Sequence, residues 1–592
     1  MNFSWIVSLS LIVGFAIDKP MFESRAELDQ ALRKYSTELG SPVLDVRRNA
    51  AKEIYEICRE YKSRTSVAIP TLLEALGDKD EKVQESVQWA LSYCEEPAIE
   101  GILTKLADSD AAIRLAAVTT LTHHIGEDFR KEVEDKILSR LSAALSDTSS
   151  EVRSKAALAI SLRPKVEDHR ILGRLQELAT AAESADRASG LHALANISDS
   201  LSDKVVTRSW KTAAERGLVD LDAEVRKSAV NLLACIDISA LDKLGPVSRA
   251  LQDQDSDVAW AALRAGKSLA ESGAEMSAFI APLQMLVPRK SPNNANDRDA
   301  AELLGIIGPP AKAAVPVLLT ALDSDDPFMV CEAAEALWKI DMRTKELLPA
   351  LRRILKSQPR EGRGEAVCDV IYGIGPAAAE LAPDVVQLLA IPDADLQWAA
   401  SDALGALGVS DPLVVNALLE ALSHRSGIVR SAAATALEKC GPEAIPLLIK
   451  ALDLEPKKSS SLLSRLSRLA TGEPLAEDPR EWIADLLGRM GADGKDSLPA
   501  MRKLLKHDNR NLRLWTAIAI GKIDGSADVV PQLIEVLKTE PGDHIRRSSL
   551  DAICTIGPAA KDALPVLRKI AADAEDDLQD SAKDAILRIE RR

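Results

Sequence analysis

The chain has 592 residues, and its 90 acidic against 74 basic side chains give a formal net charge of −16. Lysine and arginine that neutralise phosphate supply most of the affinity of nucleic-acid-binding proteins. This acidic balance, without a basic stripe, therefore argues against nucleic acid and anionic membrane surfaces as partners. Aromatic residues make up 3% of the chain, which suits closely stacked helices rich in alanine and leucine.

The N-terminal segment differs in composition from the rest of the chain. Residues from Phe3 to Ile17 carry no charge, and this run is too short to span a bilayer comfortably. It fits the apolar core of a signal peptide, with Gly14 and Ala16 as small residues at a cleavage point. We predict a signal peptide at residues 1–16, export to the periplasm or extracellular space, and no stable membrane span in the mature chain. Because no Lys or Arg precedes the run, a cytoplasmic location stays as the alternative.

From residue 25 to residue 592 one pattern recurs: an apolar helix, an Asp-rich turn, Val-Arg, an Ala-rich helix and a stop. In the second half the stops fall 33 or 34 residues apart, with one interval of 50, at Gly308, Asp341, Gly375, Gly408, Gly441, Gly491, Asp524, Gly557 and Glu590. Upstream they recur less regularly, near Arg59, Glu95, Gly126, Arg163, Ser198, Asp237 and Gly273. A period of this size indicates a solenoid, and we predict about 16 helix pairs.

The residues around position 441 show why each unit is a helix pair. Ile445, Leu448 and Leu452 recur at i, i+3 and i+7, which places them on one helical face. Gly441 ends the preceding helix because glycine readily takes the left-handed conformation, and Pro442 prevents continuation. A single pair cannot bury its apolar face alone, so neighbouring pairs have to stack.

The turns inside the pairs have their own spacing. An aspartate precedes an arginine by six residues in three turns, Asp108 with Arg114, Asp147 with Arg153, and Asp220 with Arg226. We expect each aspartate to cap the N-terminus of the second helix and each arginine to reach the aspartate of a neighbouring turn. The pattern predicts a structural ladder, and an Asp-lined cation groove is the alternative.

Two segments carry a family resemblance. "LSDTSSEVRSKAALAI" at 145–160 and "LSHRSGIVRSAAATALEKCGPEAIPLLIKAL" at 422–452 resemble HEAT repeats of the short type found in phycobilisome-lyase-like proteins. The likeness covers roughly residues 40–592. It implies an all-α, right-handed α-solenoid, and it specifies function only weakly because such scaffolds serve unrelated partners.

The 50-residue interval marks an insertion at about 457–480. Leu462, Leu463, Leu466 and Leu469 within it could form an extra short helix. An insertion inside a solenoid more often decorates one face than catalyses a reaction. A second break, at 287–300, reads as an exposed loop because it holds two prolines and three asparagines.

No linear motif in the chain carries recognisable chemistry. The seven cysteines are scattered and none forms Cys-x-x-Cys, so neither a disulfide framework nor a zinc finger is expected. His123 and Glu127 could share a helical face, but two ligands are too few for a closed metal site. We predict no catalytic residue, no metal site and no cofactor, which favours a chain that is not an enzyme. An active site assembled across repeats stays open.

Trp398, Trp482 and Trp515 lie outside the apolar stripe that faces the core. We predict that they line the concave face and anchor a protein or peptide partner, with packing between repeats as the alternative. The predicted function is a non-catalytic protein-binding scaffold of unspecified oligomeric state. The resemblance implies one other reading, a bilin-lyase-like enzyme or accessory subunit acting on a tetrapyrrole–protein substrate.

Overall fold

The computed structural model describes residues 22, 24–123, 130–163, 166–198, 201, 207–287, 295–357, 362–454, 478–540, 542–573 and 576–590. Within these ranges the regular structure is helical throughout and contains no strand, which confirms the predicted α-solenoid. Residues 1–16 and nearly all of the 457–480 insertion lie outside the described residues, so the signal peptide and the extra helix stay predictions.

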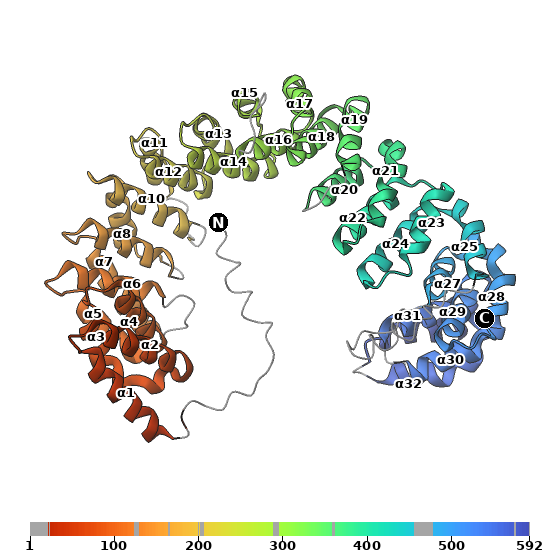
Figure 1. Ribbon diagram of the computed structural model, residues 1–592, viewed down its shortest axis with the longest axis horizontal. Helices are drawn as coiled ribbons and strands as arrows, with labels where there is room; N and C mark the ends of the chain where they lie inside the picture. The colour runs from red at the N-terminus through yellow and green to blue at the C-terminus, as the bar shows by residue number, and fades with distance from the viewer. Residues whose placement is uncertain are drawn as a thin grey trace. The chain divides into compact units, whose positions relative to one another are not determined.

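The helices alternate between two layers (Figure 1). We call the helix that begins each pair the first helix and the one that ends it the second helix. The described residues hold sixteen second helices, the even-numbered ones from α2 to α24 followed by α27, α29, α31 and α33. The number of pairs therefore agrees with the period of the sequence.

The chain forms two compact units, with a boundary between Pro282 and Leu283 inside α15 (Ser277–Leu286). In the N-terminal unit the first helices are α1 Arg25–Leu39, α3 Ile69–Ala75, α5 Glu96–Lys105, α7 Lys131–Ala144, α9 His169–Leu178, α11 Thr207–Gly217 and α13 Ala240–Ala250. Its second helices are α2 Leu44–Tyr61, α4 Glu81–Tyr93, α6 Ala111–His123, α8 Ser150–Ser161, α10 Ser184–Ser198, α12 Ala223–Cys235 and α14 Ser256–Glu271. The 3₁₀ segment η2, Lys62–Ala68, leads into α3.

The C-terminal unit repeats the same arrangement. Its first helices are α17 Val315–Ala321, α19 Thr344–Lys356, α21 Ala382–Val386, α23 Pro412–Ala421, α25 Ile445–Leu452, α28 Leu498–Leu504, α30 Val530–Thr539 and α32 Leu564–Ala572. Its second helices are α16 Ala295–Ile307, α18 Pro327–Asp341, α20 Arg363–Ile374, α22 Ala394–Leu407, α24 Gly427–Lys439, α27 Pro479–Arg489, α29 Arg510–Asp524, α31 Asp543–Ile556 and α33 Gln579–Glu590. Short 3₁₀ segments adjoin several first helices, η3 Pro309–Ala314, η4 Gly375–Leu381, η5 Gln387–Ala390, η6 Pro442–Ala444, η7 Gly491–Ser497, η8 Ala527–Val529 and η9 Gly557–Ala563.

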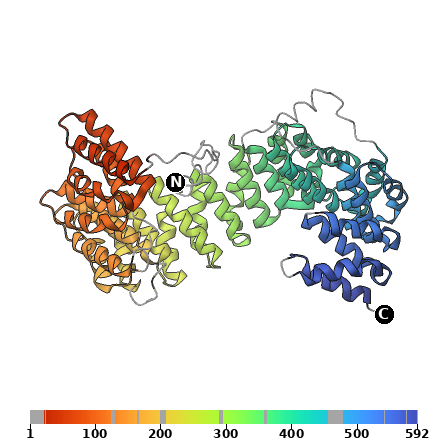
Figure 2. The ribbon, with the colours of Figure 1, turned by 90° about the horizontal axis from the view of Figure 1, so that it is seen from below.

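Successive second helices pack along much of their length, whereas successive first helices touch at fewer points. Figure 2 shows the helices of neighbouring pairs lying roughly side by side within each unit. Because the second helices are drawn together more closely, each unit by itself curves with its second helices on the concave side. The apolar core lies between the two layers and between successive pairs.

Small residues permit this close approach. A Cβ atom added to Gly405 of α22 would lie 2.8 Å from Cα of Ala436 in α24, and one added to Gly488 would lie 2.9 Å from Cα of Ala519. Real Cβ atoms do not approach backbone this closely, so a larger side chain would force the two helices apart. The second helices are therefore rich in alanine and glycine because only small side chains fit between their closely packed backbones.

The predicted stops are largely confirmed. Positive φ angles, which favour glycine, occur at Gly308, Gly375, Gly408, Gly441, Gly491 and Gly557. At the two aspartate stops the left-handed residue is the following one, Met342 with φ 51° and Gly525 with φ 66°. The stop predicted near Arg59 lies two residues further on, since α2 ends at Tyr61 and Lys62 takes φ 49°. Gly126 lies outside the described residues.

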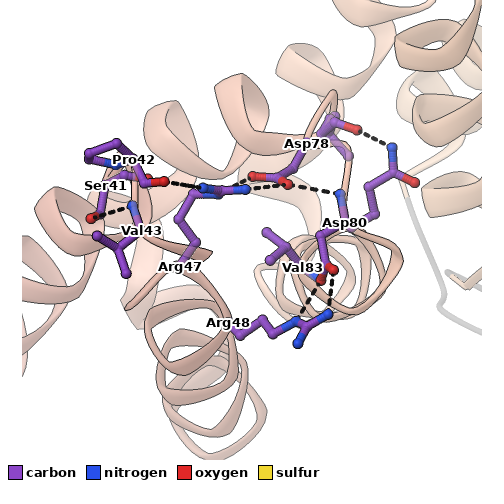
Figure 3. Close-up of polar contacts among 10 residues, drawn as sticks. Ser41, Pro42, Val43, Arg47, Arg48, Asp78, Asp80 and Val83 are labelled. Carbon is purple, nitrogen blue, oxygen red and sulfur yellow. Dashed lines mark hydrogen bonds and ion pairs between the residues drawn. The ribbon is translucent and has the colours of Figure 1, made fainter. Parts of the chain in front are cut away.

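Arginine and aspartate side chains connect successive turns, as Figure 3 shows for Arg47. Its Nε donates a hydrogen bond to Oδ2 of Asp78 over 2.7 Å, and its Nη1 donates to the carbonyl oxygen of Ser41 over 3.1 Å. One guanidinium therefore donates hydrogen bonds both to a backbone carbonyl of its own turn and to the aspartate carboxylate of the next helix pair. Its planar fork of donors suits this double role.

The same contact recurs along the N-terminal unit, in the pairs Arg114 with Asp147, Arg187 with Asp220, and Arg226 with Asp253. Arg153 instead reaches Asp186, which lies in the first turn of α10. The predicted ladder is confirmed. It holds the pKa of Asp147 below its usual range, chiefly through the hydrogen bond from Arg114.

The expected capping role belongs to other residues. Asp108 accepts a hydrogen bond from the backbone N–H of Asp110, and it is Asp110 that accepts from Ala112 at the start of α6. In the same way, Asp220 accepts from the backbone N–H of Asp222, and Asp222 accepts from the backbone N–H of Glu224 at the start of α12. The ladder aspartate closes the turn, while the residue two positions later caps the helix, because only that residue is next to the helical N–H groups.

We expect Arg153→Ala to destabilise the contact between α8 and α10. Asp186 is 2% exposed and would lose the Arg153 Nε donor, 2.8 Å away, which leaves a buried carboxylate without its ion-pair partner. The expected cost is about 3 kcal/mol, measured as faster hydrogen exchange of the α8 and α10 amides. As the control, Arg170→Ala removes a side chain that is 89% exposed and should change exchange little. Equal effects of both variants would contradict the ladder's structural role.

Candidate protein-binding face

The exposed side of the second helices is the candidate site, and α22 shows how it arises. Leu396, Ala400 and Leu404 of this helix are buried between neighbouring helices. Trp398 is 44% exposed and shares the opposite side with Asp395 and Asp402, since these positions are spaced i, i+3 and i+7. Core packing on one side of the helix therefore orients the acids and the tryptophan on the other.

Three preceding second helices of the C-terminal unit, α16, α18 and α20, also carry acidic side chains that are exposed or half-buried. These helices pack side by side with one another and with α22. We define the acidic face as these carboxylates together with those of α22: Asp299, Glu302, Glu332, Glu335, Glu365, Asp369, Asp395 and Asp402.

The electrostatics show that these carboxylates lie close together across helices. Burial raises the pKa of Glu332 to about 7, and the charges of Glu335, Glu302 and Asp299 add to the shift. Burial also raises the pKa of Asp369, with contributions from Glu335, Glu365 and Asp402 on three different helices. Like charges in proximity disfavour ionisation, so the neighbouring carboxylates add to the effect of burial on Glu332 and Asp369.

Two lysines and one further aromatic ring belong to this surface. The Nζ atom of Lys339 lies 2.6 Å from the Glu335 carboxylate, while Nζ of Lys439 lies 5.2 Å from the centre of the Tyr372 ring. Tyr372 is 51% exposed and follows Asp369 by three residues on α20. An aromatic ring beside carboxylates is a favourable position for a cation.

The three predicted tryptophans do not share one environment. Trp398 lies on the acidic face, whereas Trp482 on α27 and Trp515 on α29 are partly buried. The Trp515 ring centre lies 5.6 Å from that of His544 on the neighbouring α31, which matches the packing alternative for that residue. A role of these tryptophans in partner binding stays a prediction.

The sequence reasoning missed the acidic face and Tyr372. Their signal was available as two carboxylates spaced three, four or seven residues apart on each of these second helices, but the pattern of a single helix does not say which helices are neighbours. It also missed the environment of His123, which stacks on Trp89 with ring centres 4.0 Å apart. Burial lowers the pKa of His123 to about 4, so the imidazole is neutral at physiological pH.

Groups of metal-ligating side chains and membrane-spanning helices are both absent from the described parts of the chain. No group of three or more His, Cys, Asp and Glu side chains there is arranged to hold a metal ion. In the same residues no helix combines the length and apolar character needed to cross a membrane.

Cys58 and Cys94 are buried neighbours whose Sγ atoms lie 3.8 Å apart, with both thiols free.

Comparison with known proteins identifies the repeats. The family model for HEAT repeats matches residues 280–369, 382–459 and 472–554, which include all eight carboxylates of the acidic face. These three stretches contain HEAT repeats. The finer assignment to the phycobilisome-lyase-like type is not confirmed, and no curated protein matches the chain significantly.

Solved structures share the solenoid. A crystal structure of importin beta in an ammonium sulfate condition matches with a TM-score of 0.59 at 14% identity, over 96% of this chain and 86% of that one. A structure of Kap95p with RanGDP matches with a TM-score of 0.52 at 14% identity, over 96% and 82% of the two chains. Identity this low establishes the fold alone.

We predict that Glu332→Gln stabilises the protein in a pH-dependent way. The pKa of Glu332 is about 7 in the folded chain against an ordinary value of 4.5, so its favourable contribution is complete below pH 4.5 and is lost as the pH rises to 7. The neutral variant avoids that loss. Its advantage should grow across this interval and then level off at on the order of 1 kcal/mol, because solvent screens a partly exposed group.

Calorimetric unfolding at a series of pH values measures this effect. Glu420→Gln, which neutralises an exposed carboxylate on α23, is the matched control and should show no such trend. A stability difference for Glu332→Gln that does not vary with pH would contradict the assignment.

Proposed function

We propose that this chain is a non-catalytic scaffold that binds a protein or peptide partner on the exposed side of its second helices, at the acidic face. The single observation that carries the proposal is the presence of two large exposed aromatic rings, Tyr372 and Trp398, among clustered carboxylates on one packed surface. Exposed rings on such a surface gain free energy when a partner covers them.

The architecture supports a binding role. Second helices held side by side by close backbone contact form a firm support, and side chains on rigid elements hold their positions better than side chains on loops. Kap95p, whose structure resembles this solenoid, binds RanGDP, which illustrates that such a fold can hold another protein. Fold alone does not assign function, so the argument rests on the face itself.

Two finer assignments are also proposals. The 33-residue spacing supports repeats of the short, phycobilisome-lyase-like type. The uncharged run from Phe3 to Ile17 supports export by a signal peptide at residues 1–16, and N-terminal sequencing of the mature protein tests it.

The partner can be identified by native mass spectrometry of the complex isolated from the source cells. With that partner, we expect Trp398→Ala to weaken binding by about tenfold or more, as for an aromatic anchor at the centre of an interface. The thermal unfolding midpoint should change little because Trp398 is 44% exposed. Both quantities are measured on the full chain, by calorimetric titration and by thermal unfolding.

Trp260→Ala is the matched control, since Trp260 is 38% exposed on α14 of the other unit. Unchanged affinity of Trp398→Ala would overturn the assignment of the face. A double variant, Trp482→Ala with Trp515→Ala, separates the remaining tryptophans. If it binds normally, both are packing residues.

A further inference from the structure

We propose that Cys58 and Cys94 are a site of reversible disulfide formation, which cross-links the first two helix pairs of the chain under oxidising conditions. This inference goes beyond the proposed function, because it concerns the N-terminal unit and does not depend on a partner at the acidic face. Its basis is the direct contact of two buried sulfur atoms that belong to different helix pairs and lie 36 residues apart in the chain.

The geometry of the two thiols suits a cross-link. Cys58 lies in the last turn of α2 and Cys94 is the C-cap of α4, and these two helices pack side by side (Figure 1). The Sγ atoms are 3.8 Å apart, whereas a disulfide needs an S–S distance of about 2.05 Å. The sulfur atoms therefore have to approach by about 1.8 Å, which rotation of the side chains supplies in large part.

A second pair of cysteines shows that burial and spacing alone do not produce this contact. Cys331 on α18 and Cys368 on α20 are also buried and also lie about one repeat apart. Within the described part of the chain, no hydrogen-bond contact joins their sulfur atoms. The sulfur contact thus distinguishes Cys58 and Cys94, and the other pair is an internal control in the same molecule.

The surroundings of Cys94 favour it as the attacking group. Its Sγ atom lies 3.3 Å from Oγ1 of Thr65, in addition to its contact with Cys58. The hydrogen bond from Cys58 lowers the pKa of Cys94, and the hydrogen bond from Thr65 adds to this effect, although burial opposes it. Because the thiolate is the nucleophile in thiol–disulfide exchange, Cys94 reacts first.

The oxidant is a low-molecular-weight disulfide, such as glutathione disulfide. The Cys94 thiolate attacks one of its sulfur atoms, forms a mixed disulfide and releases one glutathione thiolate, which takes up the proton that Cys94 lost. Cys58 then loses its proton and attacks the sulfur of Cys94, which releases the second glutathione. The cysteine pair gives up two electrons and two protons, and one disulfide becomes two thiols. An excess of small thiol reverses both steps.

Both cysteine side chains are 0% exposed, so the oxidant reaches them when the helix ends open locally. The residues that follow these helix ends, Lys62 and Glu95, have φ angles of 49° and 57°. Positive φ costs free energy for residues other than glycine, so release of this strain favours opening at both cysteines. In addition, the pair of α1 and α2 packs on a single neighbouring pair within the described residues, which leaves it less supported than pairs with two neighbours.

The cross-link has a structural consequence that depends on the compartment. It closes a loop between two helix pairs and restricts the opened state, which stabilises the closed one. An exported protein meets conditions in which disulfides persist, whereas cytoplasmic thiols are kept reduced. The predicted export would therefore favour the linked form, and a cytoplasmic location would favour the two thiols.

The test incubates the reduced full chain, without denaturant, at graded ratios of glutathione disulfide to glutathione. Remaining thiols are blocked with N-ethylmaleimide, and the digest is mapped by mass spectrometry. We expect a peptide pair joined through Cys58 and Cys94 that increases with the share of glutathione disulfide and disappears with excess dithiothreitol. Cys331 and Cys368 should stay unlinked. Cys94→Ser should abolish the cross-link, whereas the matched variant Cys331→Ser should retain it.

Hydrogen exchange of the wild-type chain measures the consequence. In the oxidised protein, exchange of the α2 and α4 amides through opening of this contact should slow by about tenfold or more. The amides of α18 and α20 should exchange at the same rate in both forms. Because this comparison uses only the wild-type chain, it does not depend on the folding of any variant.

Three outcomes would overturn the inference. The first is no cross-link at any ratio, although the exposed Cys235 becomes glutathionylated in the same samples. The second is a cross-link that forms only after denaturant is added, since the native contact would then not be its source. The third is equal cross-linking of Cys331 with Cys368. None of these outcomes concerns the acidic face, for which Trp398→Ala is the separate test.

Discussion

The close approach of successive second helices is the constraint on which the other features of each unit depend. Gly405 against Ala436 and Gly488 against Ala519 allow backbone contact that a larger side chain would prevent. This approach makes the second-helix side of each unit concave, and it aligns the exposed stripes of neighbouring helices. Without it, the carboxylates of α18, α20 and α22 would be too far apart to shift one another's pKa values.

Charge has opposite roles on two sides of the repeats. In the turns, each ladder arginine meets one aspartate of the next pair, and the pairing satisfies both groups at the edge of the core. On the acidic face, burial raises the pKa of Glu332 and Asp369, and the charges of neighbouring carboxylates add to the shift. The ladder contacts therefore stabilise the packing of successive helix pairs. The carboxylates of the acidic face make no comparable contribution to stability. That contrast is the reason to assign binding to the face and not to the turns.

Much of the fold could be predicted from the sequence because its determinants are local. The 33-residue spacing, the left-handed stops such as Gly375 and Gly408, and the Asp–Arg turns each follow from a few adjacent residues. The candidate site could be predicted only in part. Trp398 was identified because it departs from the apolar stripe, but the same reasoning also selected Trp515, whose ring lies against His544 on the next second helix. A single-helix pattern cannot separate an exposed ring from one covered by a neighbour.

The sequence by itself determined the helix pairs, their number and the chemistry of their turns, since each depends on residues within one period of the chain. Only the tertiary structure decided that Glu302, Glu335, Asp369 and Asp402, which lie on four successive second helices, belong to one surface. The physical reason is that Coulomb interactions between these side chains depend on the distance across packed helices. That distance is set by the contacts of small residues in the core and is not encoded in any single repeat.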